Sequence, residues 1–358
     1  MAAPLRVSVV IANWNYAEYL GAAIDSALGL DWPDVEVVVV DDGSSDGSRA
    51  VIAGYGDRVR AIYQDNAGQR AACNAGFACT SGEVVIFLDA DDLLDRSVAR
   101  EIAAVWRPGI SKVQFRMQVI DARGASTGSV FPDFAGASAG MGSGAPTPQQ
   151  IRSWAQRSGA YPTPPGSGNA YARDFLERIF PLQGSENACD SYCLAAAPLL
   201  GDVVTIARPL VCYRVHGRND GAMATVEATR FAREVGRAQF RFRYAQQIAA
   251  SVGLSLPDTA FRHSLATLPY RLASLRLAPA QHPVAGDSLA AVVADTLRAC
   301  FVPQGRALPA RGALLLWTVL VALLPDGAAQ RLVLWRFASV SRPPVIRRAL
   351  ELLRVARR

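Results

Sequence analysis

The stretch Val84-Val85-Ile86-Phe87-Leu88-Asp89-Ala90-Asp91-Asp92 decides the fold class of this chain. Its five consecutive apolar residues predict a strand buried on both faces, the pattern of a parallel sheet. The acidic residues follow directly, and open α/β sheets bind ligands at the carboxyl ends of such strands. Crowded carboxylates repel one another unless a cation or a polar ligand neutralises them. The stretch therefore predicts a site for Mg²⁺ or Mn²⁺, with a helix N-cap at Asp91 or Asp92 as the alternative.

Two similar strands lie upstream of this one. Residues 35–40 are almost wholly apolar and β-branched, and they end in Asp41-Asp42-Gly43-Ser44. Residues 7–12 form a first strand, followed by a polar turn and a helix over residues 17–28. Three strand-then-helix units in the first hundred residues predict a doubly wound, mainly parallel sheet flanked by helices. The carboxyl ends of the three strands are expected to converge on one crevice.

Four motifs in this region resemble the opening of glycosyltransferase family 2. They are VSVVIANWNYAEYL, VEVVVVDDGSSDGS, QDNAGQRAACNAGF and GEVVIFLDADDLL, in that order and spacing. The resemblance covers residues 5 to 105, resumes at residues 164–170 and runs to residues 213–219. It implies a GT-A (Rossmann-like) α/β fold and a nucleotide-sugar-dependent enzyme.

By motif position, the resemblance implies that the first-strand turn and the second acidic cluster hold the nucleotide. Trp14 stacks on the base, and Asp41 or Asp42 accepts a hydrogen bond from the base or the ribose. The expected nucleotide-sugar-binding residues are Ala12, Asn13, Trp14, Asp41, Asp42, Asn66, Gln69, Arg70, Asp89, Ala90, Asn169 and Arg214. Ala12-Asn13-Trp14 stands where Pro-Thr-Tyr is frequent in the family, which leaves the base open: a UDP-sugar is favoured and a GDP-sugar is the alternative.

Several of these assignments have a plainer reading. Arg70 meets a phosphate or is a surface residue on a helix, and Asn169 bonds a sugar hydroxyl or only shapes a turn beside Gly168. Arg214 is expected to pair with phosphate oxygens.

The resemblance also implies the metal ligands and the catalytic base. Asp89-Ala90-Asp91 occupies the position of the family's DxD motif, so Asp89 and Asp91 are expected to hold Mn²⁺ or Mg²⁺, with His216 as a further ligand. Such a cation stabilises the charge that develops on the departing nucleoside diphosphate. Asp190 is the expected base for the acceptor hydroxyl, and Glu186 is the alternative. An N-cap or surface role for Asp190 is the plainer interpretation.

Composition excludes several other classes of protein. The 358 residues carry a formal charge of +6 and a hydrophobic content of 51%. There is no basic patch interleaved with aromatic residues and no recognition-helix motif, so no nucleic-acid partner is expected. Six cysteines without a CxxC pair, and three scattered histidines, argue for free thiols and against a zinc site. The N-terminus resembles no signal peptide, so a cytoplasmic location is expected.

The domain prediction is a GT-A catalytic domain over residues 1–224 and a helical region over residues 225–358. A Gly-, Ala- and Ser-rich stretch over 133–148 is expected to be a flexible loop. Helices are expected over 227–252 and 261–277. Residues 313–324 are apolar but too few to span a bilayer, which takes about twenty, so a buried helix or one lying in the membrane interface is expected.

Residues 331–358 interleave arginines with apolar side chains, a pattern that suits an anionic membrane surface. Packing on the catalytic domain or on a second subunit is the alternative, so an oligomer is compatible with the pattern. The expected location is peripheral, at the inner face of the plasma membrane.

The function that follows is an inverting glycosyltransferase (EC 2.4, hexosyltransferase-like). It would move a sugar from a nucleotide-diphosphate donor to a hydroxyl of a saccharide or lipid-linked acceptor, in bacterial surface polysaccharide or glycolipid synthesis. The inverting outcome and the pathway rest on the resemblance. A nucleotidyltransferase, and a non-catalytic nucleotide- or sugar-binding scaffold, are the two alternatives.

Overall fold

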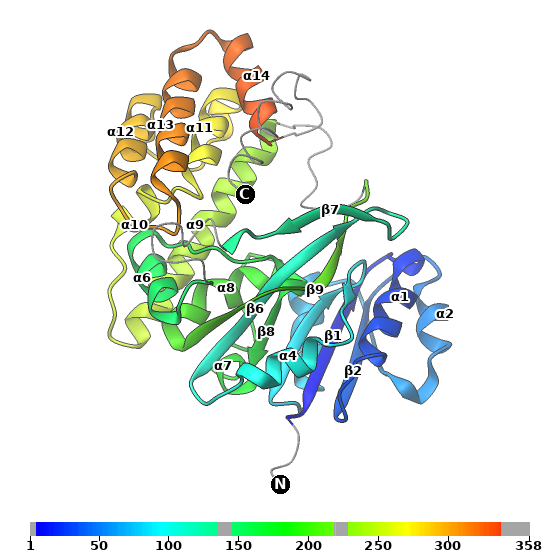
Figure 1. Ribbon diagram of the computed structural model, residues 1–358. Helices are drawn as coiled ribbons and strands as arrows, with labels where there is room; N and C mark the ends of the chain where they lie inside the picture. Colours follow the sequence, from blue (N-terminus) through cyan, green and yellow to red (C-terminus); the bar gives the residue numbers. More distant parts are fainter. Residues whose placement is uncertain (1–4, 135–144, 218, 220–227, 338–358) are drawn as a thin grey trace. The chain divides into compact units, whose positions relative to one another are not determined.

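The computed structural model describes residues 5–134, 145–217, 219 and 228–337. Contacts between Cα atoms divide the chain into two compact units. The first contains residues 1–215, 240–257 and 304–307, and the second contains residues 216–239, 258–303 and 308–358. The first unit holds the β-sheet and the second is helical (Figure 1).

The first unit is built on a sheet of nine strands, counted over the described residues. The strand order is β3 (Arg60–Gln64), β2 (Val35–Asp42), β1 (Val7–Asn13), β4 (Val84–Asp89), β8 (Asn169–Ala172), β6 (Ile110–Ile120), β9 (Asp202–Arg214) and β5 (Leu93–Leu94), with β7 (Ser126–Phe131) paired to β6. Strands β3, β2, β1 and β4 are parallel, and β9 is parallel to β6. Strand β8 is antiparallel to both β4 and β6. The predicted mainly parallel α/β fold is confirmed, and β8 marks where the parallel order is interrupted.

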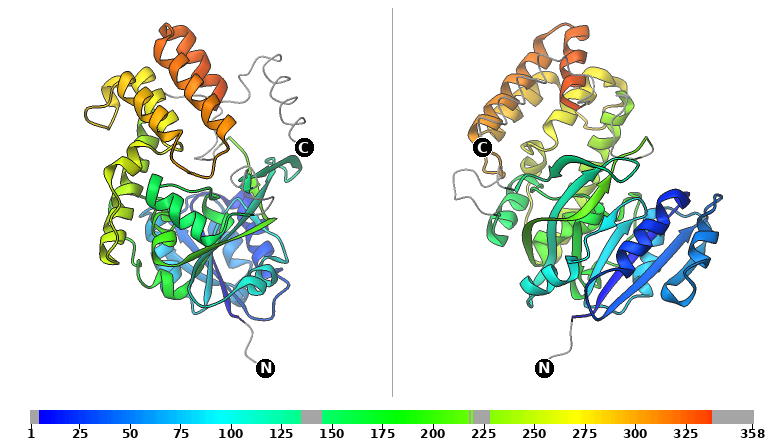
Figure 2. Two further views of the ribbon diagram at one scale, coloured as in Figure 1. Left: turned by 60° about the vertical axis from the view of Figure 1, so that its left-hand side comes forward. Right: turned by 45° about the vertical axis from the view of Figure 1, so that its right-hand side comes forward.

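Helices cover both faces of this sheet because successive side chains of the central strands point to opposite sides. In β1, Val9 and Ile11 enter one core while Val10 enters the other. Helices α1 (Ala17–Leu28), α2 (Ser48–Ala53) and α4 (Val98–Val105) pack in the first core. Helices α3 (Gln69–Ala78), α6 (Pro148–Ser158), α7 (Arg173–Leu176) and α8 (Cys189–Leu200) pack in the second (Figure 2).

The carboxyl ends of the central strands meet at one edge of the sheet. Asn13 at the end of β1 is the register partner of Asp41 in β2. Ala12 is the register partner of Asp89 in β4. This register confirms the predicted convergence of the polar and acidic residues. The convergence was predictable because the ends of parallel strands lie at the same edge of a sheet.

The second unit is a helical cluster. It contains the first part of α9 (Ala228–Ser251) together with α10 (Asp258–Arg262), α11 (Leu268–Leu277), α12 (Leu289–Ala299), α13 (Leu308–Leu323) and α14 (Asp326–Phe337). Its core is formed by side chains that include Phe231, Leu272, Val292, Val321 and Val333.

The helix expected over 227–252 is confirmed as α9, but a single helix over 261–277 is wrong. The chain ends α10 at Arg262 and starts α11 at Leu268, with Pro269 in its first turn. Proline has no N–H to donate and clashes with the preceding turn, so it starts a helix more readily than it continues one.

Within the described ranges, no helix has both the length and the apolar run that a membrane crossing needs. The stretch expected to be a flexible loop, 133–148, lies mostly outside the described residues, as does most of the basic stretch 331–358.

Candidate active site

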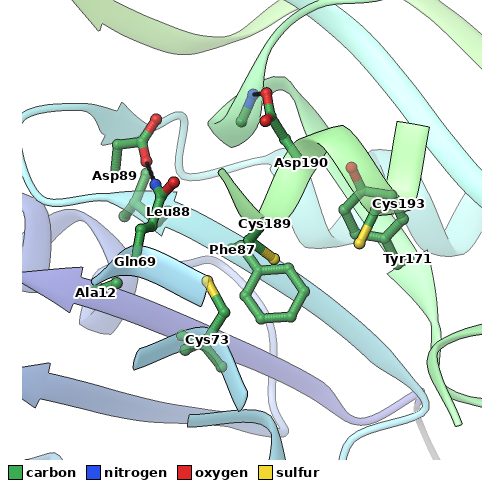
Figure 3. A pocket seen from close by; sticks show the side chains of 12 residues that line it. Ala12, Gln69, Cys73, Phe87, Leu88, Asp89, Tyr171, Cys189, Asp190 and Cys193 are labelled. Atoms are coloured by element: carbon green, nitrogen blue, oxygen red, sulfur yellow. Dashed lines mark hydrogen bonds between the residues drawn. The ribbon is translucent and has the colours of Figure 1, made fainter. Parts of the chain in front are cut away.

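Two carboxylates from distant parts of the chain line one pocket of the first unit. Asp89 ends β4, and its Oδ1 accepts a hydrogen bond from Gln69 Nε2 at 3.1 Å. Asp190 lies in the first turn of α8, and its Oδ2 accepts from the backbone N–H of Gly166 at 3.2 Å. Apolar and thiol side chains also line the pocket, namely Val10, Phe87, Cys73, Cys189 and Cys193, together with Tyr171. Figure 3 shows Cys73, Phe87 and Cys189 close to one another. The arrangement places a carboxylate from each half of the resembling region at the same opening.

The electrostatics of this opening favour a cation. Burial, together with the nearby charges of Asp91 and Asp190, raises the pKa of Asp89 to about 7. Hydrogen bonds from Ser167 and Gln69 oppose the shift only in part. A carboxyl held this way is costly to ionise without a positive partner, so a bound cation would relieve the repulsion.

Asp89 gives a prediction for stability against pH. A carboxyl whose pKa is higher in the folded protein stabilises the fold while protonated, and that contribution is lost as pH rises from about 4 to about 7. We therefore expect Asp89→Asn to be more stable than the wild type at pH 8 without divalent metal, and so to unfold at a higher urea concentration. The expected gain in free energy of unfolding is only about 1 to 2 kcal/mol, because solvent screens the partly exposed side chain. The gain should shrink towards pH 5. An equal difference at both pH values would contradict this, and the exposed Asp57→Asn serves as the control.

Arg214 and Asp92 fix the loop that carries the acids. Asp92 is fully buried, and its Oδ1 accepts from the backbone N–H of Arg214 at 2.9 Å. The Arg214 side chain donates from Nε to the Asp91 carbonyl at 2.8 Å and from Nη1 to the Ala122 carbonyl at 3.2 Å. The expected phosphate contact of Arg214 stays a prediction, while its contacts here hold the Asp91 backbone in place.

Asp92 gives a second prediction. Burial, followed by the charges of Asp89 and Asp91, raises the pKa of Asp92 well above its usual range, which favours the neutral carboxyl. We expect Asp92→Asn to keep the acceptor and to change stability little. Asp92→Ala should cost about 2 kcal/mol, because the buried Arg214 N–H loses its partner. Urea unfolding of both variants checks this, and equal losses would contradict it.

The turn after β1 is held by side chains of the loop after β2. Asn13 is buried, and its Nδ2 donates to Asp41 Oδ1 at 3.2 Å and to Ser44 Oγ at 3.1 Å. Asp41 Oδ2 also accepts from Arg49 Nε at 3.0 Å. Asn13 Oδ1 is buried without a partner among the described residues, and the neighbouring Trp14 is 53% exposed. Asn13 Oδ1 thus keeps acceptor capacity that no described residue uses, and Trp14 offers an exposed aromatic ring.

Asp42 serves the loop before α3. Its Oδ1 accepts from Gln64 Nε2 at 2.6 Å and from the Ala67 N–H at 2.9 Å, and its Oδ2 accepts from the Gly68 N–H at 2.8 Å. Gly68 has φ +86°, and a Cβ there would lie 2.2 Å from Asn187 Oδ1, so only glycine fits. A carboxylate with three internal donors has little acceptor capacity left for a ligand.

The remaining predicted residues fall in three places. Asn66 and Gln69 are exposed at the start of α3, where Arg70 donates from Nη1 to the Leu182 carbonyl at 3.1 Å. Ala12 lines the pocket, and Ala90 is buried in the acidic loop. His216 belongs to the second unit, where its backbone N–H donates to Asn219 Oδ1.

Asn169 is used by the Pro-rich turn. Its buried Nδ2 donates to the carbonyls of Pro164, Pro165 and Gly166 at 3.2, 3.2 and 3.0 Å. The plainer reading, in which Asn169 shapes the turn, accounts for these contacts. Glu186 is also engaged locally, because its Oε1 accepts from the Ala188 N–H at 3.0 Å, and it does not line the pocket.

Sequence reasoning missed two residues of the Gly166-Ser167-Gly168 run. Ser167 is buried, and its Oγ accepts from the Asp89 backbone N–H at 3.0 Å. A Cβ on Gly166 would lie 2.6 Å from Asp89 Oδ2. The run therefore packs its backbone against the acid, and two glycines flanking a serine before an apolar strand were the available signal.

Lys112 was also missed as a neighbour of this site. The only lysine of the chain is fully buried on β6, and its Nζ donates to Thr163 Oγ1 at 2.7 Å. Burial lowers its pKa well below the usual range, although the charges of Cys193 and Asp190 oppose that shift. Its neighbour Tyr171 lines the pocket and has a buried hydroxyl without a hydrogen-bond partner among the described residues.

The donor set suits a hard divalent cation. Asp89 and Asp91 offer carboxylate oxygens, the ligands that Mg²⁺ and Mn²⁺ prefer. In the part of the chain that the structure describes, no three His, Cys, Asp or Glu side chains are grouped to hold an ion by themselves. Substrate oxygens would have to complete the shell of an ion held by Asp89 and Asp91.

Comparison with known proteins identifies the chain. The model of Glycosyl transferase family 2 matches residues 8–124, from the second residue of β1 to just past the end of β6. A protein of Nostoc sp., described as an uncharacterized glycosyltransferase, is 36% identical over 236 residues, covering 63% of this chain and 69% of that protein. The α/β fold and the matches to this family and this relative together define a nucleotide-sugar-dependent glycosyltransferase of EC 2.4. The chain belongs to glycosyltransferase family 2, a family of GT-A enzymes.

Two solved structures are also similar. Staphylococcus aureus TarS 1–349 in complex with UDP-GlcNAc has a TM-score of 0.49 and 16% identity, covering 89% of this chain and 90% of that one. The mannosyltransferase PcManGT of Pyrobaculum calidifontis, in complex with GDP-Man and Mn²⁺, has a TM-score of 0.48 and 19% identity, covering 93% and 86%. Strand order and register establish the fold of this chain independently of these two proteins.

Proposed function

We propose that this enzyme transfers a sugar, with inversion, from a nucleoside-diphosphate donor to a hydroxyl of a saccharide or lipid-linked acceptor. It would act in bacterial surface polysaccharide or glycolipid synthesis at the inner face of the plasma membrane. The observation that carries the proposal is the shared pocket of Asp89 and Asp190 beside the acidic loop. A UDP-sugar is the favoured donor and a GDP-sugar the alternative.

The proposed nucleotide binding rests on the turn after β1. Asn13 Oδ1 would accept a hydrogen bond from a ring N–H of the base, and Trp14 would stack on its face. Asp41 would hold Asn13 and Arg49 in position rather than bind the base itself, because its carboxylate already has three donors, the third being the Ser44 N–H at 3.3 Å.

The proposed metal binding rests on Asp89 and Asp91. These residues would hold Mn²⁺ or Mg²⁺, which supplies positive charge against the developing charge of the nucleoside diphosphate. Gln69 and Ser167 orient Asp89, and the Arg214 side chain holds the Asp91 backbone. His216 remains a proposed further ligand.

The proposed removal of the proton from the acceptor hydroxyl rests on Asp190. The backbone N–H of Gly166 donates to one of its oxygens and leaves the other for an acceptor hydroxyl. Attack by that hydroxyl on the anomeric carbon from the face opposite the departing diphosphate would invert the configuration. Glu186 is the weaker choice because its carboxylate holds the Ala188 N–H at the start of α8.

The test is product analysis. Purified protein is incubated with Mn²⁺ and a panel of UDP- and GDP-sugars, with membrane extract as the source of acceptor. Release of UDP or GDP from one donor, coupled to labelled product, supports the proposal. Release of inorganic pyrophosphate from nucleoside triphosphates with sugar phosphates would identify a nucleotidyltransferase instead.

A further inference from the structure

Helix α13 presents an apolar face to solvent. Leu308, Leu316 and Leu323 are 73%, 61% and 80% exposed, and Leu320 is 39% exposed. The other exposed residues of the helix are Pro309, Gly312 and Ala313, so no charged side chain interrupts this face. At 1.5 Å per residue, the 16 residues of α13 extend the face over roughly 24 Å.

The opposite side of α13 is already used. Leu314, Thr318 and Val321 are buried within the second unit. The exposed leucines are therefore not the inward stripe of the helix, and their exposure costs free energy in water. An uninterrupted patch of this kind marks a surface for another apolar phase.

The end of α12 extends the patch. Arg311 near the start of α13 donates from Nη1 to the Cys300 carbonyl at 2.9 Å, which ties the two helices together. Phe301, the next residue, is 81% exposed, and Leu297, one turn earlier, is 49% exposed. We refer to Leu297, Phe301, Leu308, Leu316, Leu320 and Leu323 as the apolar face.

The charge of the second unit indicates the partner. Its carboxylates in the described ranges are Glu234, Asp258, Asp287, Asp295 and Asp326, and its arginines there are Arg230, Arg233, Arg237, Arg262, Arg271, Arg276, Arg298, Arg311, Arg331 and Arg336. Glu234, Asp287, Asp295 and Asp326 form ion pairs with arginines of the unit. The ten arginines therefore outnumber the five carboxylates, and some of them lie at the surface, such as Arg331 and also Arg298, which contacts Asp295 at 3.8 Å.

A lipid surface fits these observations better than a second copy of the chain. Two copies would bring surplus positive charge together, which opposes association. An anionic bilayer accepts apolar side chains and attracts arginines at the same time.

We propose that the apolar face inserts into the interface of an anionic lipid membrane. The apolar face would be the surface by which the enzyme reaches the membrane location given in the proposed function. The inference rests on that function only for the reason why the enzyme would bind a membrane.

The experiment is vesicle flotation. Full-length protein is mixed with vesicles of equal parts phosphatidylglycerol and phosphatidylcholine, or of phosphatidylcholine alone. The test variant is Leu316→Gln with Leu323→Gln. The matched control is Val252→Gln with Leu254→Gln, two exposed apolar residues of the first unit. Thermal unfolding verifies that both variants fold.

We expect wild type and control to float with the anionic vesicles, and the test variant to bind at least about tenfold more weakly. Equal binding of all three proteins to the anionic vesicles would overturn the proposal. Wild-type binding to pure phosphatidylcholine vesicles as strong as to the anionic vesicles would overturn it too. Light scattering gives the oligomeric state of each protein. If wild type and control were dimers and the test variant a monomer, a second copy of the chain would be the occupant of the apolar face, which would also overturn the proposal. Nucleotide-sugar turnover without lipid is measured in parallel, so that its failure counts against the proposed function alone.

Discussion

Replacing Asp190 with asparagine should lower kcat about 10³-fold, a typical contribution of a general base. Asparagine keeps the size of the side chain and an oxygen for the Gly166 N–H, but it cannot take a proton. Nucleotide affinity should persist, because the proposed base-binding residues lie on the turn after β1. The measurement is the initial rate of nucleoside diphosphate release at saturating donor and acceptor.

The control for Asp190 is Glu186→Gln. Glu186 does not line the pocket, and glutamine still offers an oxygen to the Ala188 N–H, so kcat should change little. If Glu186→Gln abolished turnover while Asp190→Asn retained it, the two roles would have to be exchanged. If neither variant lost activity, no base would be assigned to the start of α8.

Replacing Arg271 with methionine should destabilise the second unit by about 3 to 5 kcal/mol. The Arg271 side chain is fully buried, and its Nε and Nη2 donate to Asp287 at 2.7 and 2.6 Å. Nη2 also donates to Asp295 at 3.0 Å. Removing the guanidinium leaves two carboxylates without this partner, one of them Asp287, whose pKa the hydrogen bond from Arg271 lowers against the effect of burial.

Urea or thermal unfolding checks the Arg271 prediction, with the exposed Arg331→Met as the matched control. Asp287 also fixes the sign of the pH dependence. A lowered pKa stabilises the fold above about pH 4, and this contribution is lost as pH falls. The gap between wild type and Arg271→Met should therefore narrow in acid. A loss no larger than that of Arg331→Met would contradict the prediction.

The central strands were predictable because burial on both faces leaves a plain mark in the sequence. Residues 7–12, 35–40 and 84–88 are apolar runs, and β1, β2 and β4 begin at the same residues and end within two residues of the predicted ends. The convergence of their carboxyl ends followed from parallel order. The antiparallel strand β8 left no such mark, because its four residues read equally well as part of a loop.

Motif position proposed residues for the site, but it did not predict their hydrogen-bond partners. The contact between Gly166 and Asp190 and the hydrogen bond from Asp89 to Ser167 join segments that lie far apart in sequence. Such pairs depend on tertiary packing, which local pattern does not specify. The same holds for Asp42, whose hydrogen bonds from the loop before α3 were not predicted and whose ligand contact stays a prediction.

The most direct test of the account is calorimetric titration of UDP and GDP, with and without Mn²⁺, into wild type and Asp91→Ala. We predict that one nucleotide binds the wild type in a Mn²⁺-dependent way, and that this dependence is lost in Asp91→Ala. The nucleotide that binds also fixes the base of the donor. Failure of both nucleotides to bind with Mn²⁺, or equal Mn²⁺-dependent binding by Asp91→Ala, would contradict the proposed site.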